Sequence, residues 1–326
     1  MQPAIKVQNL RKDYEYYRKA PGLKGSFMSL FKREKLITTA VSSISFTIQE
    51  GELVGFLGPN GAGKTTTLKM LSGILHPTSG SATVLGHTPW NREPVYQKQF
   101  SIVMGQKNQL WWDLPAQESF LLNKEIYEVP DADYQETVEE LTALLDVEDL
   151  LDIPVRKLSL GQRMKCELVA ALLHRPKVLF LDEPTIGLDV ISQQNIREFI
   201  TSYNRKARTT ILLTSHYMED IEQLCHRVII INKGVIGYDG ALDQLVSRYV
   251  DHKVLTVTFE KPVKKDALLS YGDVVRFEAQ HAVIHVPRGE AKDRAARLLS
   301  SSLPVDDILI DEEQIDDVIR KVFQSN

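Results

Sequence analysis

The chain of 326 residues is 43% hydrophobic and 25% charged, which is typical of a globular protein with a sizeable core. Its formal net charge of −4 provides no excess of basic residues, so no nucleic-acid partner is expected. The two cysteines, Cys166 and Cys225, lack metal-ligand spacing and are too few for a disulfide scaffold, which indicates a reducing compartment.

The sequence contains no uninterrupted run of about 18 apolar residues, the length needed to cross a bilayer. Residues 1–10 also lack the apolar centre of a signal peptide. We therefore expect a cytoplasmic protein. If it acts at a membrane, another chain must supply the membrane-spanning part.

Short apolar runs alternate with helical patterns through most of the first 240 residues. This alternation predicts an α/β fold with a mostly parallel sheet, because buried parallel strands carry continuous apolar runs. The predicted strands are 53–57, 101–104, 178–182, 210–214 and 228–232, and two of the predicted helices are 64–71 and 192–203.

Two regions depart from this alternation. Residues 107–175 contain helical patterns at 116–128, 133–145 and 160–174 but no convincing strand, which predicts a helical subdomain. After residue 240, strands at 254–259, 274–278, 282–286 and 307–310 mix with helices near 290–300 and 313–323. We therefore expect one domain over 1–240 and a small α+β accessory domain over 241–326.

A phosphate-binding loop follows the first predicted strand of the parallel sheet. The motif G-x-x-x-x-G-K-T consists of Gly58, Pro59, Asn60, Gly61, Ala62, Gly63, Lys64 and Thr65. Backbone N–H groups of such a loop converge on phosphate oxygens, Lys64 reaches the terminal phosphates, and Thr65 is a ligand for Mg²⁺. Thr66 is assigned to the same nucleotide-binding set.

Two acidic residues end the apolar strand 178–182, at the edge of the sheet where α/β folds bind ligands. Asp182 is placed to hold Mg²⁺, and Glu183 is placed to act as general base toward the attacking water. Such a pair is often only a solvated turn, but its occurrence beside a phosphate loop favours the catalytic interpretation.

Together these motifs resemble the nucleotide-binding subunits of ABC transporters over residues 4–240. The stretch Leu158-Ser159-Leu160-Gly161-Gln162-Arg163 resembles the family signature, with Leu160 where the family usually has glycine. Gln106 resembles the Q-loop glutamine, 187–189 the D-loop, and His216 the switch histidine. Tyr14 resembles the aromatic residue that stacks on adenine, although Tyr16 and Tyr17 compete for that role.

The resemblance implies a P-loop ABC core with an antiparallel β subdomain and a helical subdomain. It also implies that two subunits share each ATP site. ATP and Mg²⁺ are then bound between two copies of the chain, or this chain and a close relative. Ser159, Gly161 and Gln162 of one subunit face the phosphates held by the other. Gln106 would serve both as metal ligand and in catalysis, together with His216 and Glu183. The motifs at 105–106, 110–115 and 182–189 are similar to a group of bacterial exporter ATPases.

Two segments are candidates for contact with a membrane partner. The apolar residues just after Gln106 either fill the core or receive a transmembrane permease; they are Trp111, Trp112, Leu114, Phe120 and Leu121. Residues 16–35 are either a solvated loop or a basic amphipathic helix at the lipid surface. A soluble ATPase acting on ribosomes or DNA, and a regulator that does not transport, are the competing functions.

Overall fold

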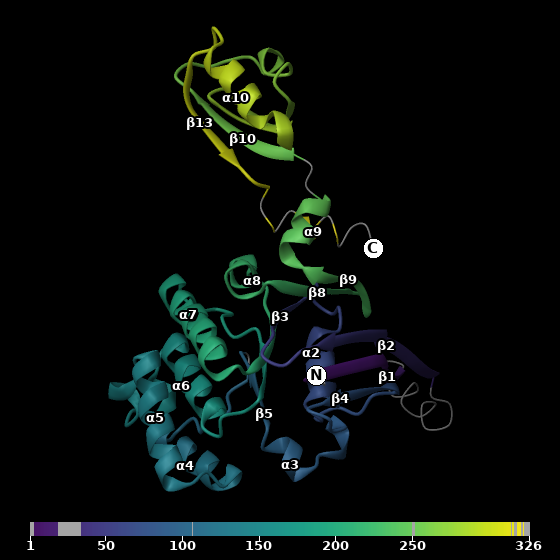
Figure 1. The fold of residues 1–326 in the computed structure, drawn as a ribbon, viewed down its shortest axis with the longest axis vertical. Coiled ribbons are helices and arrows are strands. Elements are labelled where there is room, and N and C mark those ends of the chain that lie inside the picture. Colours follow the sequence, from purple (N-terminus) through teal and green to yellow (C-terminus); the bar gives the residue numbers. More distant parts are fainter. Residues whose placement is uncertain are drawn as a thin grey trace, which may run out of the picture. The chain divides into compact units, whose positions relative to one another are not determined.

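The computed structural model describes residues 3–18, 34–105, 107–249 and 252–313, together with 315, 318–320 and 322. The chain divides into two compact units, Met1–Gly240 and Ala241–Asn326, each with its own elements (Figure 1).

A six-stranded sheet forms the centre of the first unit, in the order β5-β6-β7-β3-β8-β9. The five strands from β5 to β8 in this order pair in parallel, as predicted from their continuous apolar runs. Every residue of β6 and β7 is buried. The strands are β3 (Leu53–Leu57), β5 (Phe100–Met104), β6 (Val178–Asp182), β7 (Thr210–Thr214), β8 (Arg227–Asn232) and β9 (Val235–Ala241).

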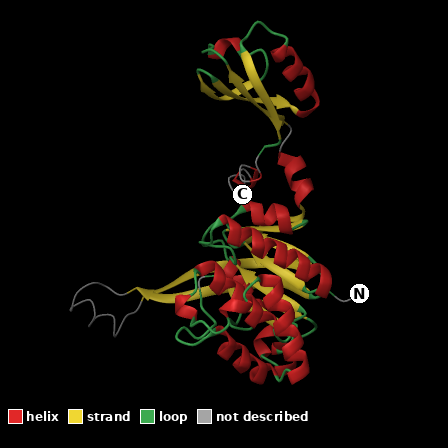
Figure 2. Cartoon of the chain, turned by 90° about the vertical axis from the view of Figure 1, so that its left-hand side faces the viewer, coloured by secondary structure: helices red, strands yellow, loops and turns green. Residues whose placement is uncertain are grey.

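A second sheet is antiparallel and has the order β2-β1-β4. Its strands are β1 (Ile5–Arg18), β2 (Glu34–Ile48) and β4 (Ser79–Val84). The ends of β1 and β2 extend as a hairpin away from the sheet (Figure 2). Tyr16 and Tyr17 pair in this hairpin with Leu36 and Lys35. The prediction of a membrane-surface helix that begins at Tyr16 was therefore wrong. Residues 19–33, where its apolar positions fall, lie outside the described residues.

The predicted helices are confirmed, with ends shifted by a few residues. Three lie between β5 and β6: α4 (Ala116–Tyr127), α5 (Asp131–Leu145) and α6 (Leu160–Leu172). The others of this unit are α2 (Lys64–Leu71), α3 (Pro94–Gln97), α7 (Val190–Ala207) and α8 (Met218–Leu224). Helix α2 packs into the core between the two sheets, where Phe46 of β2 meets Phe56 of β3.

The second unit contains a four-stranded antiparallel sheet in the order β11-β12-β10-β13. Its elements are α9 (Leu242–Tyr249), β10 (His252–Phe259), β11 (Asp273–Glu278), β12 (His281–Pro287), α10 (Ala291–Leu299) and β13 (Val305–Asp311). Alternate residues of β10 and β12 face α10, because side chains of a strand point to opposite faces. Of the helix predicted over 313–323, residues 315, 318–320 and 322 are helical in the structure, and 314, 316, 317, 321 and 323 lie outside the described residues. Among the helices that the structure describes, none combines the length and apolar character that crossing a bilayer requires.

Candidate functional site

The carboxyl ends of three neighbouring strands bring the predicted functional residues to one edge of the central sheet. Gly58 follows β3, Asp182 ends β6, and His216 comes two residues after β7. Strand β7 lies between β6 and β3, and both pairings are parallel, so these three ends share an edge. This edge is where open α/β sheets bind their ligands.

Loop 58–65 is shaped by glycines where the backbone passes close to other chain segments. A Cβ on Gly58 would lie 2.2 Å from the carbonyl oxygen of Ile231, and Gly63 has φ +108°. The Lys64 ammonium donates hydrogen bonds to the carbonyl oxygens of Gly58 (2.6 Å) and Pro59 (3.2 Å). Burial lowers the pKa of Lys64, against the opposing effect of the nearby acids. The backbone of the loop therefore surrounds the buried ammonium group of Lys64.

Asp182 is buried and accepts hydrogen bonds from two hydroxyl groups. Thr65 Oγ1 donates to its Oδ2 (2.8 Å), and Thr214 Oγ1 donates to its Oδ1 (2.7 Å). Because each of its oxygens accepts one hydrogen bond, the carboxylate has a fixed orientation beside the first turn of α2. Thr214 was not predicted as a site residue. The available signal was its hydroxyl group at the carboxyl end of the buried strand β7.

Glu183 has an unusual backbone conformation that the neighbouring strands maintain. Its φ is +57°, in the region that non-glycine residues rarely occupy. Its N–H donates to the carbonyl oxygen of Thr214 (3.0 Å), and a Cβ on Gly105 would lie 2.1 Å from the Glu183 carbonyl oxygen. Gly105 is therefore required for the close approach of the two segments.

The Glu183 side chain meets the imidazole of His216. Glu183 Oε1 lies 2.7 Å from His216 Nε2. Beside it is a cavity of about 160 Å³ lined by Thr65, Lys69, Met104, Gly105, Lys107, Asp182 and Glu183. A small charged group entering this cavity would meet two acidic residues, a threonine and two lysines.

A buried ionic network supports the segments on either side of this pair. The fully buried Asp220 accepts hydrogen bonds from Thr185 Oγ1 (2.5 Å), Ser215 Oγ and Arg197 Nε (2.6 Å). Thr185 follows Glu183 by two residues, and Ser215 directly precedes His216. Asp220 and Arg197 thus hold both loops. Their role could not be predicted from the sequence, because Thr185 and Arg197 lie 35 and 23 residues from Asp220.

The signature-like stretch begins helix α6 with a reciprocal cap. Gln162 N–H donates to Ser159 Oγ (3.2 Å), and Ser159 N–H donates to Gln162 Oε1 (2.9 Å). Ser159 is exposed. Leu160 lies against the turn of its own chain, because a Cβ on Gly187 would lie 3.2 Å from Leu160 Cδ2. The substitution of leucine for glycine is therefore accommodated within the chain.

Gly161 lies beside the start of α7. A Cβ on Gly161 would lie 2.4 Å from Ser192 Oγ. Asp189 caps α7 by accepting from the N–H (2.9 Å) and hydroxyl (2.6 Å) of Ser192, and these bonds lower the pKa of Asp189. Segments 159–161 and 187–192 are thus in contact within one chain.

The other predicted residues that the structure describes lie outside the group that converges on the phosphate loop. Tyr14 lies on β1, 40% exposed, with the Lys12 ammonium 5.5 Å from its ring centre. Gln106 lies outside the described residues. Phe120 is fully buried, so core packing is the correct interpretation for this residue, whereas Trp111 and Trp112 are about half exposed. Leu114 and Leu121 are also exposed.

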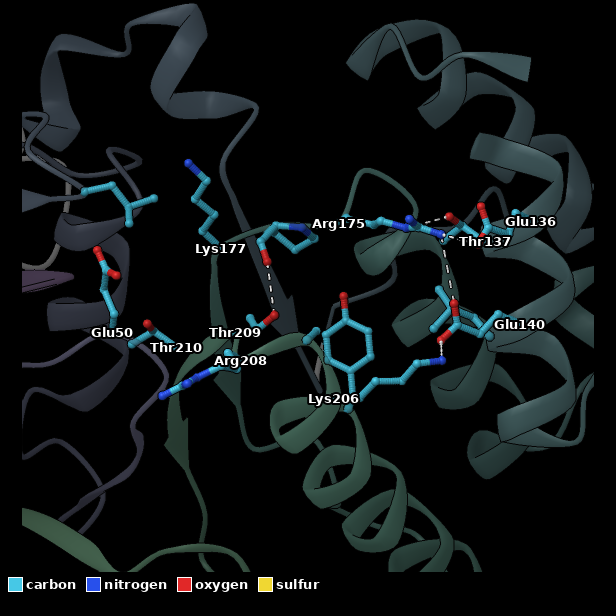
Figure 3. A pocket seen from close by; sticks show the side chains of 15 residues that line it. Glu50, Glu136, Thr137, Glu140, Arg175, Lys177, Lys206, Arg208, Thr209 and Thr210 are labelled. Carbon is cyan, nitrogen blue, oxygen red and sulfur yellow. Dashed lines mark hydrogen bonds and ion pairs between the residues drawn. The ribbon is translucent and has the colours of Figure 1, made fainter. Parts of the chain in front are cut away.

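A larger cavity, of about 570 Å³, lies at the opposite edge of the sheet, where β6 and β7 begin (Figure 3). Lys177 precedes β6, and Thr210 starts β7. Arg175 and Lys206 turn toward α5, where they contact Thr137 and Glu140. Cavity size therefore does not identify the site; the convergence of loop, acids and imidazole does.

Comparison with known proteins agrees with this geometry. A family described as ABC transporter matches residues 41–186, and one described as EvrA-like ABC transporter, C-terminal domain, matches residues 251–311. The chain is 35% identical over 215 residues to the ABC transporter ATP-binding protein NatA of Bacillus subtilis, covering 66% of this chain and 87% of that protein. It is 34% identical over 267 residues to the Nod factor export ATP-binding protein I of Burkholderia pseudomallei, covering 81% and 86%.

Other relatives are much longer, and the chain spans 28% of one and 18% of another. Among solved structures, a dimeric ATP-binding cassette in a post-hydrolysis state with ADP and phosphate superimposes with a TM-score of 0.60. It shares 21% identity and covers 73% of this chain and 98% of its own, so this likeness concerns the fold. The P-loop ABC fold with parallel, antiparallel and helical parts, predicted from the sequence, is confirmed.

Proposed function

The chain belongs to the ATP-binding subunits of ABC transporters, and we propose that two copies hydrolyse ATP between them to drive export through a membrane permease. The observation that carries this proposal is the convergence of Lys64, Thr65, Asp182, Glu183 and His216 at one edge of the sheet. Phosphoryl transfer depends chiefly on positioning and charge neutralisation, and this set provides both.

We assign phosphate binding to loop 58–65, with Thr66 beside it. Lys64 is buried and donates only to carbonyl oxygens of its own loop among the hydrogen bonds described. A phosphate oxygen is a stronger acceptor for an ammonium group than a carbonyl, so exchange of these bonds favours binding. The N-terminus of α2 adds a positive partial charge at the same point.

We assign Mg²⁺ to Thr65 and Asp182, with Gln106 as the third protein ligand. A hydroxyl and a carboxylate oxygen, already within 2.8 Å of each other, are the donors that Mg²⁺ prefers. No cluster of three His, Cys, Asp or Glu residues suited to a metal occurs among the described residues, which fits an ion completed by phosphates and water. When bound, Mg²⁺ neutralises negative charge on the phosphates.

We assign the general base to Glu183. Its carboxylate faces the cavity beside Asp182, and His216 fixes its orientation through the 2.7 Å contact. A base must lie within hydrogen-bonding reach of the water whose proton it takes, and the rigid backbone of Glu183 maintains that position. His216 and Gln106 are assigned to positioning the water and the γ-phosphate.

We propose that the second copy completes the site through the exposed N-terminus of its α6. Ser159 presents its hydroxyl there, and the first-turn N–H groups of a helix attract anions. Gly161 and Gln162 belong to the same turn. Tyr14, exposed on β1, is assigned to the adenine.

The exposed Trp111, Trp112, Leu114 and Leu121 form a surface that we assign to the permease, on the cytoplasmic side of the membrane. Tryptophan is enriched at the centres of protein interfaces. Two adjacent tryptophan side chains that are each about half exposed therefore favour docking over core packing. Export is supported by the likeness to a Nod factor export protein over 86% of its length.

The test is ATP hydrolysis by the purified full-length chain at varied protein and Mg²⁺ concentrations. We expect hydrolysis to require Mg²⁺ and to rise more steeply than linearly with protein concentration, because two copies form each site. Lys64→Ala should abolish hydrolysis, whereas Lys261→Ala, an exposed change in the second unit, should leave it unchanged. Hydrolysis strictly proportional to protein concentration down to the nanomolar range would contradict a shared site.

A further inference from the structure

Helix α6 carries three polar residues on one face, at spacings of four residues. Ser159, Arg163 and Glu167 occupy positions i, i+4 and i+8, which lie above one another on a helix. Eight residues span about 12 Å along the axis. Ser159 is at the exposed end of this row, and Glu167 is buried at the other end.

Glu167 binds the backbone of the segment that follows Gln106. Its Oε1 accepts hydrogen bonds from the N–H groups of Gln109 (2.9 Å) and Leu110 (3.3 Å). Its Oε2 is buried with no hydrogen-bond partner among the described residues, and the burial raises the pKa of this carboxyl despite the two N–H donors. Keeping a half-satisfied acid in the core is costly, so this residue type indicates a specific role beyond packing.

Arg163 makes the next contact between α6 and the same segment. Its guanidinium lies 5.7 Å from the ring centre of Trp112, within the range of a cation–π interaction. The segment is also held by α4, since the Trp111 N–H donates to Ser119 Oγ (3.0 Å). Segment 109–112 is thus attached to α6 through Gln109, Leu110 and Trp112, and to α4 through Trp111.

We propose that Glu167 and Arg163 are positioning residues that couple segment 109–112 to Ser159, so that the tryptophan surface and the signature end of α6 move as one body. This inference rests on the proposed function, in which Ser159 completes a nucleotide site of the second copy. A partner seated on Trp111 and Trp112 thereby acts on a site that it does not touch. Helix α6 contains no proline, and no glycine after Gly161, so it lacks the usual causes of a kink between the two contacts.

The test uses a Trp90→Phe background, in which Trp111 and Trp112 are the only tryptophans because the chain has three. Tryptophan emission is recorded while the non-hydrolysable analogue adenylyl imidodiphosphate is added with Mg²⁺. In the otherwise unaltered chain, emission should change as the two copies close. In Glu167→Ala the change should fall at least about threefold, and kcat for ATP about 10-fold, while KM stays within about twofold.

The conservative Glu167→Gln should restore both readouts, since its amide oxygen still accepts from the two N–H groups. Arg163→Ala should reduce the emission change. Lys165→Ala is the matched control, because it removes one positive charge from α6 at a position with no described contact to segment 109–112.

A full emission change and full kcat in Glu167→Ala would overturn the coupling, as would failure of Glu167→Gln to restore them. If Glu167→Ala does not fold, as judged by circular dichroism, Arg163→Ala decides, and an unchanged emission response overturns the inference. A parent chain that hydrolyses no ATP would overturn the proposed function and the coupling together. An active parent whose Glu167→Ala and Arg163→Ala variants keep the full emission change and full kcat would overturn the coupling alone.

Discussion

The imidazole Nε2 of His216 lies 2.7 Å from Oε1 of Glu183, although the two residues come from different strands. Glu183 follows β6 and His216 follows β7, so their contact depends on the parallel pairing of these strands. At this distance the imidazole fixes the orientation of the carboxylate that we assign as general base.

Replacing Glu183 by Gln should leave ATP binding intact and slow hydrolysis by about 10²–10⁴-fold, because loss of a general base removes a contribution of this size. The ATP-bound dimer should then persist in size-exclusion chromatography. Glu198→Gln, an exposed change on α7, is the control for loss of one negative charge. Hydrolysis by Glu183→Gln at near the parent rate would refute the assignment of the base.

Mixing two inactive variants tests whether the site is shared. A Lys64→Ala chain and a Ser159→Arg chain each form defective sites alone, but their mixed dimer contains one complete site. An equal mixture should recover roughly a quarter of parent activity, because half of the dimers are mixed and each holds one good site. Absence of recovery, with mixed dimers demonstrated by cross-linking, would mean that each chain works alone.

Asp220→Ala should reduce the free energy of unfolding by about 3–5 kcal/mol, because it removes the buried carboxylate that pairs with the buried Arg197. Glu219→Ala is a matched control, since Glu219 contacts the same guanidinium (3.1 Å) from an exposed position and should cost under about 1 kcal/mol. Urea denaturation monitored by circular dichroism measures both. Equal losses for the two variants would contradict the role of burial.

Stability should rise as the pH increases from about 4 to 6.5, in part through His174. Its Nε2–H donates to the carbonyl oxygen of Phe100 (3.1 Å), its ring stacks on Tyr127, and burial lowers the pKa of His174 to about 4. In this window the unfolded histidine binds a proton that the folded one does not, so protonation favours unfolding.

The contribution of His174 reaches up to roughly 3 kcal/mol above pH 6.5 and disappears as the pH falls toward 4. His174→Gln should flatten the pH dependence of the urea midpoint in this window, whereas His226→Gln, an exposed change, should not. An unaltered slope in His174→Gln would show that other groups produce it.

Truncation after Gly240 should give a chain that still binds ATP, because the loop, acids and imidazole all lie before that residue. We expect its hydrolysis to depend more steeply on protein concentration, since we propose that residues 241–326 stabilise the dimer. The measurement is ATPase activity against protein concentration for both lengths. A folded truncated chain that binds no ATP at high protein concentration would place part of the site in the removed unit.

The sequence alone determined the elements that build the site. Strand 178–182 was predicted to the residue because a continuous apolar run has clear polar boundaries, and helix 64–71 because it follows directly on the phosphate-loop motif. The phosphate loop and the two acids could be identified because their chemistry depends on neighbours in the chain.

Only the tertiary structure decided which distant residues meet. The contacts of Thr214 with Asp182, of Thr185 with Asp220 and of Glu167 with segment 109–110 join residues more than 30 positions apart, which local patterns do not encode. The same holds for Phe120 and Trp111, which have similar apolar character but opposite exposure. Local propensity and periodicity fix how a segment folds, whereas the packing of segments against one another fixes which side chains are buried and which are left to bind a partner.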